Sequence, residues 1–236
     1  MLEYLKNKRV MIVVAHPDDE LLGLGATMNM LIQKWKIKTH VVILGEGITG
    51  RSEVRDLKLW NKHLTIHKKN ISSAQKAIGY HSLKTYDFPD NRFDSVALLD
   101  IIKAVEKEKS EFKPDVIFTH HGGDVNIDHQ RTFESVITAC RPMEFESVKC
   151  IITFETPSGT EWRSVSDPRQ FLPNLFFSVT EQNLNAKIKG MECYKYEKRT
   201  FPHPRSPEAL RIQAQRWGVV VGNTLAEAFQ IIRMIN

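Results

Sequence analysis

The sequence predicts an α/β protein built on a mostly parallel sheet with helices on both faces. Short apolar runs alternate along the chain with longer polar segments of helical character, as in consecutive βαβ units. Proline and glycine separate the helical segments near the C-terminus. Neither an internal repeat nor a low-complexity linker interrupts this pattern, so we expect residues 1–236 to form a single domain.

The expected strands are six short apolar runs, at residues 9–14, 39–44, 84–88, 115–119, 150–155 and 175–179. Helices are expected in the polar segments between the first five of these strands, at residues 20–35, 53–79, 95–109 and 129–140, and the segment at 53–79 could form one helix or two. After the last strand the pattern predicts only helices, at residues 181–199, 207–217 and 224–234. Residues 158–173 are rich in Ser, Trp, Arg and Pro, and we expect them to form an irregular loop beside the site.

The composition is ordinary for a globular protein, with 42% hydrophobic and 26% charged residues in a chain of 236 residues. No apolar run approaches the roughly 20 residues that cross a bilayer, and the first residues lack a signal-peptide core. We therefore expect a cytoplasmic protein without a membrane span. The three cysteines are widely spaced, which indicates neither a disulfide framework nor a thiolate zinc site. The formal charge of +5 is spread along the chain, which favours a solvated basic surface over nucleic-acid binding.

Two polar clusters follow apolar runs, and each precedes a segment of helical character. The first is HPDDE, from His16 to Glu20, and the second is HHGGDVNIDH, from His120 to His129. In an open α/β sheet, ligands bind beyond the carboxyl ends of the strands. We therefore expect the two clusters to meet at one edge of the sheet, although they are far apart in the sequence.

The residue types in these clusters suit a catalytic metal site. Zinc in such sites takes three ligands from His and carboxylate groups and leaves a position for water, whose pKa it lowers to about 7. We assign His16, Asp19 and His129 as the ligands. Asp18 then serves as the general base, and the neighbouring cation favours its ionised form. The simpler alternative is that the acids cap helices, which would suit Asp18, Asp19, Glu20 and Asp128. Two such clusters at equivalent strand ends favour a site.

These residues resemble a known family, the zinc-dependent de-N-acetylases that include LmbE-like proteins and N-acetylglucosaminyl-phosphatidylinositol de-N-acetylase (PIG-L). The resemblance spans almost the whole chain, and the pairing of AHPDDE with a distant DH is highly specific. The matching segments are AHPDDE at 15–20, DFPDNRFD at 87–94, HHGGDVNIDH at 120–129, FPHPRSPEA at 201–209 and GVVVGNTLAEAF at 218–229.

The resemblance implies a Rossmann-like fold and hydrolysis of an acetamide on an amino sugar, with release of acetate and a free amine. By the same resemblance His16, Asp19 and His129 match the metal ligands and Asp18 matches the general acid/base. Asp128 would be a charge-relay group that orients a neighbouring ligand. The native metal stays open between Zn²⁺ and Fe²⁺, because two histidines and one carboxylate suit either ion. A homo-oligomer is compatible with the resemblance.

The chain departs from the family pattern three residues before His129. Several members carry a histidine there, where it is thought to stabilise the oxyanion, and this chain has Asn126. An asparagine amide can also donate a hydrogen bond to a tetrahedral intermediate. The alternative donor is His203, which is held between two prolines in an extended segment.

Four further residues are candidates for contact with the substrate. Arg51 ends the loop after the second expected strand, where its guanidinium could bind a carboxylate, phosphate or sugar oxygen. Asp90 and Asn91 follow the third expected strand, and Arg205 lies beside His203. Each could equally be a solvated side chain or an anchor of its own loop.

Several other functions remain open from the sequence. The leading prediction is removal of an N-acetyl group from an amino sugar or its conjugate, such as a sugar nucleotide, glycan or glycolipid precursor. The same metal chemistry could serve an amidase of a larger thiol or acyl conjugate, and a non-catalytic carbohydrate-binding module is a third alternative. The loop from Gly45 to Gly50 also matches GxGxxG, as in NAD-dependent oxidoreductases. The acid expected about 20 residues later is missing, since Asp87 lies much further on.

Overall fold

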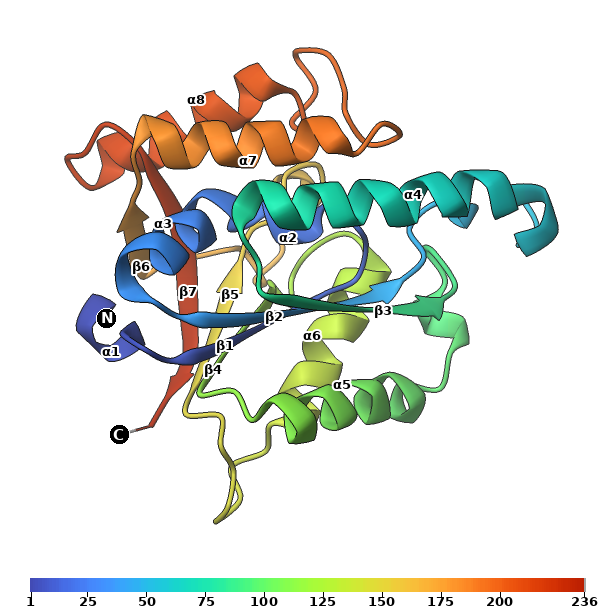
Figure 1. Cartoon of the computed structure of the whole chain (residues 1–236), viewed down its shortest axis with the longest axis horizontal. Coiled ribbons are helices and arrows are strands. Elements are labelled where there is room, and N and C mark those ends of the chain that lie inside the picture. The colour runs from blue at the N-terminus through green and yellow to red at the C-terminus, as the bar shows by residue number, and fades with distance from the viewer. Residues whose placement is uncertain (236) are drawn as a thin grey trace.

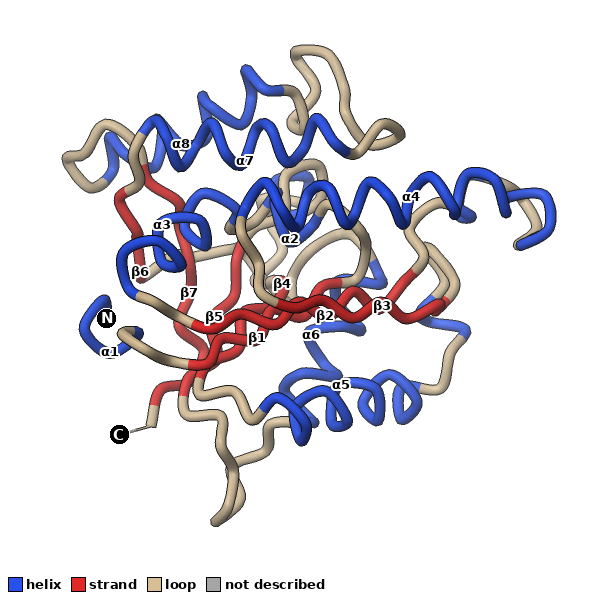
Figure 2. Tube along the Cα trace, in the orientation of Figure 1, coloured by secondary structure: helices blue, strands red, loops and turns tan. Residues whose placement is uncertain are grey.

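The computed structural model describes residues 1–235 and shows a seven-stranded sheet in the order β3-β2-β1-β4-β5-β7-β6. Strands β1 to β5 are parallel, and β7 pairs antiparallel with both β5 and β6. Helices cover both faces of the sheet, with α5 and α6 on one side and α3, α4, α7 and α8 on the other (Figures 1 and 2). The predicted α/β class with a mostly parallel sheet is confirmed.

The strands are β1 (Arg9–Val14), β2 (Lys38–Gly45), β3 (Ser82–Phe88), β4 (Val116–His120), β5 (Cys150–Phe154), β6 (Leu175–Ser178) and β7 (Ala226–Met234). The helices are α1 (Leu2–Leu5), α2 (Asp19–Leu22), α3 (Gly25–Trp35), α4 (Leu57–Ile78), α5 (Leu98–Phe112), α6 (Ile127–Ala139), α7 (Glu181–Cys193) and α8 (Pro207–Val220). Short 3₁₀ turns lie at Thr49–Arg51, Phe93–Ser95 and Thr160–Trp162.

The central strand β1 shows why the sheet needs two helical layers. Its residues from Val10 to Val14 are fully buried, as expected for a parallel strand that is covered on both faces. Val10 and Ile12 pack into the core beneath α3, whereas Met11 and Val13 pack into the core beneath α5 and α6. Because successive side chains point to opposite faces, one strand supplies both cores.

The last element corrects the sequence prediction. Residues 224–234 were expected to form a helix, and residues 226–234 form β7 instead. The segment LAEAFQ has residues that favour helices, but propensity is a weak prior that tertiary contacts override. In this fold β7 fills the gap between β5 and β6, and its Phe229 is fully buried in the core.

Smaller differences concern the helices, and one of them is that the helix expected at 181–199 ends at Cys193. The helix expected at 20–35 is divided into α2 and α3, and the helix expected at 53–79 begins only at Leu57, where Asp56 accepts hydrogen bonds from two backbone N–H groups. The short helix α1 was not predicted. No helix in the described part of the chain is long and apolar enough to cross a membrane.

Candidate active site

The two polar clusters meet because β1 and β4 are neighbouring parallel strands. Val10 to Val13 pair with Val116 to Thr119, so the carboxyl ends of both strands lie at the same edge of the sheet. The loop after β1 carries His16 and leads into α2 at Asp19, and the loop after β4 leads into α6, whose first turn holds His129.

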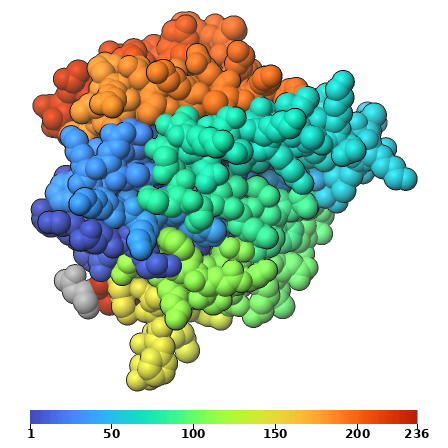
Figure 3. Space-filling view, viewed as in Figure 1, coloured from blue at the N-terminus to red at the C-terminus, as the bar shows by residue number. Residues whose placement is uncertain are grey.

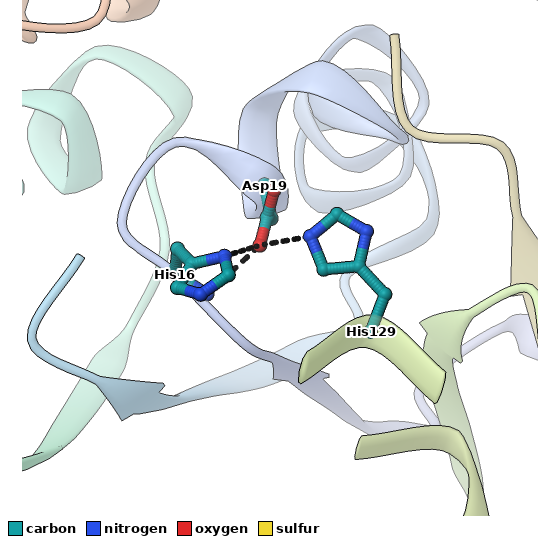
Figure 4. Close-up of side chains that lie close together, drawn as sticks. All are labelled: His16, Asp19 and His129. Carbon is teal, nitrogen blue, oxygen red and sulfur yellow. Dashed lines mark hydrogen bonds and ion pairs between the residues drawn. The ribbon is translucent and has the colours of Figure 1, made fainter. Parts of the chain in front are cut away.

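The structure brings His16, Asp19 and His129 together, and all three are buried (Figure 4). Asp19 Oδ2 lies 3.5 Å from His16 Nδ1 and 3.4 Å from His129 Nε2. Tetrahedral zinc with bonds of 2.0–2.1 Å separates its ligand atoms by about 3.3 Å. The donor set and its spacing therefore fit a zinc-sized ion.

The other ring nitrogen of His16 faces carboxylates. Its Nε2 lies 2.8 Å from Asp128 Oδ2 and 3.3 Å from Asp90 Oδ1. Asp128 is fully buried and also accepts hydrogen bonds from the backbone N–H groups of Asn91 and Phe93. Burial lowers the pKa of His16, but the bonds with Asp128 and Asp19 outweigh it and raise the pKa well above its usual value. This contact leaves Nδ1 as the nitrogen that faces Asp19.

His129 has an equivalent carboxylate, Asp124, which the sequence analysis did not assign. His129 Nδ1 lies 3.2 Å from Asp124 Oδ1, although the contact falls outside hydrogen-bond geometry. Despite the opposing effect of burial, Asp19 and Asp124 raise the pKa of His129 to about 9. Asp124 is held by the Thr160 hydroxyl at 2.7 Å and by the backbone N–H of Asn126 at 2.8 Å. The only signal for Asp124 was its place inside the second cluster.

His120 is a second residue that the sequence analysis left without a role. Its ring stacks on His129 with centroids 3.9 Å apart, and its Nε2 lies 3.3 Å from Asp19 Oδ2. The backbone N–H of Ala15 donates to the same nitrogen at 2.9 Å, so His120 Nε2 carries no proton. Burial and the charge of His129 lower the pKa of His120 to about 4. A neutral ring therefore packs beneath the proposed ligands.

Asp18 lies at the end of a strained turn. Its φ of 107° is in the left-handed region, which costs energy for a residue with a side chain and is often found at functional sites. The backbone N–H of Asp18 donates to Glu20 Oε2 at 3.0 Å, and Glu20 in turn accepts a 2.6 Å bond from the Tyr194 hydroxyl. Burial raises the pKa of the Asp18 carboxyl well above its usual value, and the nearby Arg205 opposes this effect.

A cavity of about 260 Å³ opens beside the proposed metal ligands. Its polar lining includes the proposed base and every residue that the sequence analysis nominated for substrate contact or oxyanion binding. These lining residues are His16, Asp18, Arg51, Asp90, Asn91, Asn126, His203 and Arg205, together with Trp162, Glu197 and Arg199.

The two candidate oxyanion donors differ in how they are held. The side-chain oxygen of Asn126 accepts a hydrogen bond from the backbone N–H of Asp128 and so caps α6. Its side-chain nitrogen donates a hydrogen bond to the side-chain oxygen of Asn91 at 3.0 Å. His203 Nδ1 accepts a bond from the backbone N–H of Arg205, which places the ring proton of a neutral imidazole on Nε2. Burial and the charges of Arg205 and Arg199 lower the pKa of His203, which favours the neutral ring. Its Nε2–H is therefore available as a donor.

Both candidate arginines already have carboxylate partners. Arg51 pairs with Glu197, and Arg205 donates to Asp18 at 3.0 Å and to Glu197 at 2.9 Å. Glu197 is buried and was not predicted, because nothing in its sequence neighbourhood marks it. Asp90 is also engaged within the protein, since its Oδ2 accepts a bond from the backbone N–H of Gly50 at 2.9 Å. These residues therefore hold the cavity wall together through contacts within the protein, and they also face the cavity.

Comparison with known proteins gives a consistent result. Residues 11–140 match the family model described as PIG-L, GlcNAc-PI de-N-acetylase. The chain is 30% identical over 195 residues to the uncharacterized deacetylase YaiS of Escherichia coli K12, which covers 80% of this chain and 92% of YaiS.

Solved structures share the fold at lower identity. The N,N'-diacetylchitobiose deacetylase of Pyrococcus horikoshii superposes with a TM-score of 0.70 and 19% identity, over 98% of this chain and 88% of that one. The 4-carboxy-2-hydroxymuconate hydratase GalB of Pseudomonas putida KT2440 superposes with a TM-score of 0.74 and 18% identity, over 97% of this chain and 98% of that one. The same fold thus carries deacetylases and a hydratase, so the reaction has to be argued from the site.

Proposed function

Because the chain belongs to the PIG-L family of deacetylases, we propose that it is a metal-dependent hydrolase that removes the N-acetyl group of an amino sugar or its conjugate and releases acetate. The observation that carries this proposal is the convergence of His16, Asp19 and His129 on one point beside Asp18, at the wall of a polar cavity.

His16, Asp19 and His129 would hold the ion, with Zn²⁺ as the first choice and Fe²⁺ as the alternative. A divalent ion held there would act as a Lewis acid on an amide carbonyl, and it would lower the pKa of a water molecule to about 7. Asp19 is suited to this role, since burial raises the pKa of its carboxyl but the charge of His129 outweighs this effect and holds the pKa well below the usual range.

Asp18 acts as the general base and then as the general acid of the reaction. Its carboxylate accepts a proton from the attacking water as the oxygen adds to the amide carbon, and it then delivers this proton to the nitrogen as the C–N bond breaks. A general base works best when its pKa lies near the working pH. Burial moves the pKa of Asp18 upward in that direction.

The tetrahedral intermediate needs a donor for its oxyanion. The Nε2–H of His203 is the better placed chemically, because its Nδ1 is held as an acceptor and the proton is fixed on the other nitrogen. Asn126 has one amide N–H beyond the bond to Asn91, and it is the second candidate.

The polar cavity supports a small hydrophilic substrate such as an N-acetylated sugar, and the diacetylchitobiose deacetylase with the same fold acts on such a sugar. Arg51, Asp90, Asn91 and Arg205 would contact its hydroxyl groups from the cavity wall. An amidase acting on a larger conjugate would use the same proton transfers with a different pocket occupant. A binding module without turnover would have no use for Asp18.

The glycines of the GxGxxG match have another physical explanation than dinucleotide binding. Gly47 has a φ of +68°, and a side chain there would collide with Pro17 of the first cluster. A side chain at Gly50 would press on Asp90 and Asn91. The loop is glycine-rich because it packs closely against the site.

The test is an acetate-release screen over N-acetylhexosamines and their conjugates, with purified protein that is chelated and then reloaded with Zn²⁺ or Fe²⁺. We expect metal-dependent acetate release that falls by at least about 10² in Asp18→Asn, with the metal content unchanged. Turnover that survives chelation, or that the substitution leaves undiminished, would remove the proposed mechanism.

A further inference from the structure

Four lysines that are separated in the sequence lie on one side of helix α4, which we call its outer side. Lys58, Lys62, Lys69 and Lys76 follow one another at intervals of four and seven residues. At 3.6 residues per turn they fall within about 40° of one another, and they form a stripe about 27 Å long. All four side chains are exposed, and the buried face of α4, which includes His67, Ala74 and Ile78, lies on the opposite side.

In the described part of the chain, no acidic side chain pairs with the lysines of this stripe. The sequence of α4 contains five lysines and no acid. In residues 1–235 none of these lysines forms an ion pair. Like charges four residues apart destabilise a helix, and a lysine in the first turn opposes the helix dipole. When such an unfavourable arrangement of charges is not offset by contacts within the fold, it indicates a binding partner outside the protein.

The charges near the stripe do not neutralise it. The exposed acids at the start of α4 are Glu53 and Asp56, and Asp56 is engaged with the backbone N–H groups of Lys58 and Leu59. Helix α7, which packs beside α4, adds the exposed Lys189 and the exposed Glu192 (Figure 1). Figure 3 shows that part of α4 lies on the surface of the molecule.

Exposed apolar side chains lie at and just before the N-terminal end of α4. Val54, Leu57 and Leu59 are 72%, 44% and 67% exposed. Lysines attract an anionic surface, and apolar side chains beside them can enter the boundary between headgroups and acyl chains. A polyanion such as a nucleic acid would use the lysines but would leave these apolar groups in water.

We propose that the lysine stripe of α4, with Val54, Leu57 and Leu59 at its beginning, docks the protein on an anionic lipid bilayer. The stripe begins seven residues after Arg51, which lines the cavity, so Lys58 lies no more than about 25 Å from the cavity wall. The proposal is independent of the reaction, because none of these residues lines the cavity beside the proposed metal ligands.

Vesicle co-sedimentation tests this docking directly. The full chain is mixed with vesicles of phosphatidylcholine alone, or with vesicles in which a quarter of the lipid is phosphatidylserine. We expect binding to the second kind only, weakened by high salt. Each basic residue near the surface contributes about fivefold in partitioning, so the triple change Lys58→Gln, Lys62→Gln, Lys69→Gln should weaken binding by about 100-fold.

A matched variant controls for net charge. Lys34→Gln, Lys38→Gln, Lys107→Gln removes three exposed lysines elsewhere and should bind like the original protein. Glutamine favours helices about as well as lysine, so α4 should fold in the stripe variant, as circular dichroism will check. Leu59→Gln should weaken vesicle binding while leaving retention on heparin unchanged.

Three results would overturn the proposal: no binding to the anionic vesicles, equal loss in both triple variants, or stripe-dependent retention on heparin without vesicle binding. The last result would assign the stripe to a soluble polyanion. None of these outcomes depends on acetate release, so a failure here is distinct from a failure of the proposed reaction.

Discussion

Each proposed histidine ligand faces a carboxylate of its own: His16 bonds with Asp128, and His129 lies 3.2 Å from Asp124. Such a carboxylate fixes which ring nitrogen faces the metal and raises its basicity. The ligands themselves were predictable because their residue types stand in clusters after strands. Asp124 and the neutral His120 stand in the same cluster but were not assigned, since the sequence does not show which acid or histidine of a cluster acts through another side chain.

The role of Asp128 can be measured through metal affinity. Asp128→Asn removes the charge but keeps a side chain of the same shape, and we expect the affinity for Zn²⁺ to fall about 10- to 100-fold. Competition titration against a chromophoric chelator gives this value without any substrate. Asp94→Asn, at an exposed carboxylate of the same region, is the control and should not change the affinity. Equal affinities in all three proteins would show that Asp128 does not orient a ligand.

The buried Glu20 holds the strained backbone of Asp18 through the Asp18 N–H and is itself fixed by the Tyr194 hydroxyl. We expect Glu20→Leu to lower kcat by about 10², the smaller end of what a positioned general base contributes, with little change in KM. Glu20→Gln keeps an acceptor for the Asp18 N–H and should stay within a few fold of the original rate. A general loss of folding would not separate these two variants, so thermal melts of both accompany the kinetics.

Among the elements, β7 shows where sequence reasoning fails and why. Its residues have helical propensity, and its strand conformation comes from pairing with β5 and β6, which are distant in sequence. Strands β1, β2 and β4 were predictable because each contains a continuous apolar run. Glu227, a buried acid at the second position of β7, interrupts such a run and has no explanation until the fold is known.

Glu227 joins three elements, and its removal should be costly. Its carboxylate pairs with Lys187 of α7 at 2.6 Å and accepts a 2.7 Å bond from the backbone N–H of Thr27 in α3. Removing one partner of a buried ion pair typically costs about 3–5 kcal/mol. We expect a loss of this size for Glu227→Leu in urea denaturation. Adding Lys187→Met to the same chain should restore part of it, and full additivity of the two changes would argue against coupling.

At the scale of the whole molecule, the site follows from the parallel sheet. Parallel strands deliver the segments after β1, β2, β3 and β4 to one edge, and these segments carry the proposed ligands, Arg51, and the pair Asp90 and Asn91. That part of the site could be predicted from topology alone. Glu197 and the fixed tautomer of His203 come from the segment between α7 and α8, whose position depends on helix packing that the sequence does not reveal.

The pH dependence of stability should report on His67, which is buried between α4 and the segment that carries Tyr194 and Tyr196. Within residues 1–235 neither of its ring nitrogens has a hydrogen-bond partner. Burial, together with the charges of Arg51 and His16, lowers the pKa of His67 to about 4. In the unfolded chain a histidine titrates near 6.5.

Because the folded pKa is the lower one, the unfolded state binds the proton first as the pH falls. The contribution of His67 is therefore complete above about pH 6.5 and is lost progressively toward pH 4. Between pH 7.5 and pH 5 this loss amounts to about 2 kcal/mol, at about 1.4 kcal/mol for each pH unit below the unfolded value. Denaturation curves of the original chain and of His67→Leu, both with chelator to remove metal effects, should differ in pH slope by this amount. Parallel slopes across the range would mean that His67 is solvated or protonated in the folded protein, and the buried neutral ring would have to be abandoned.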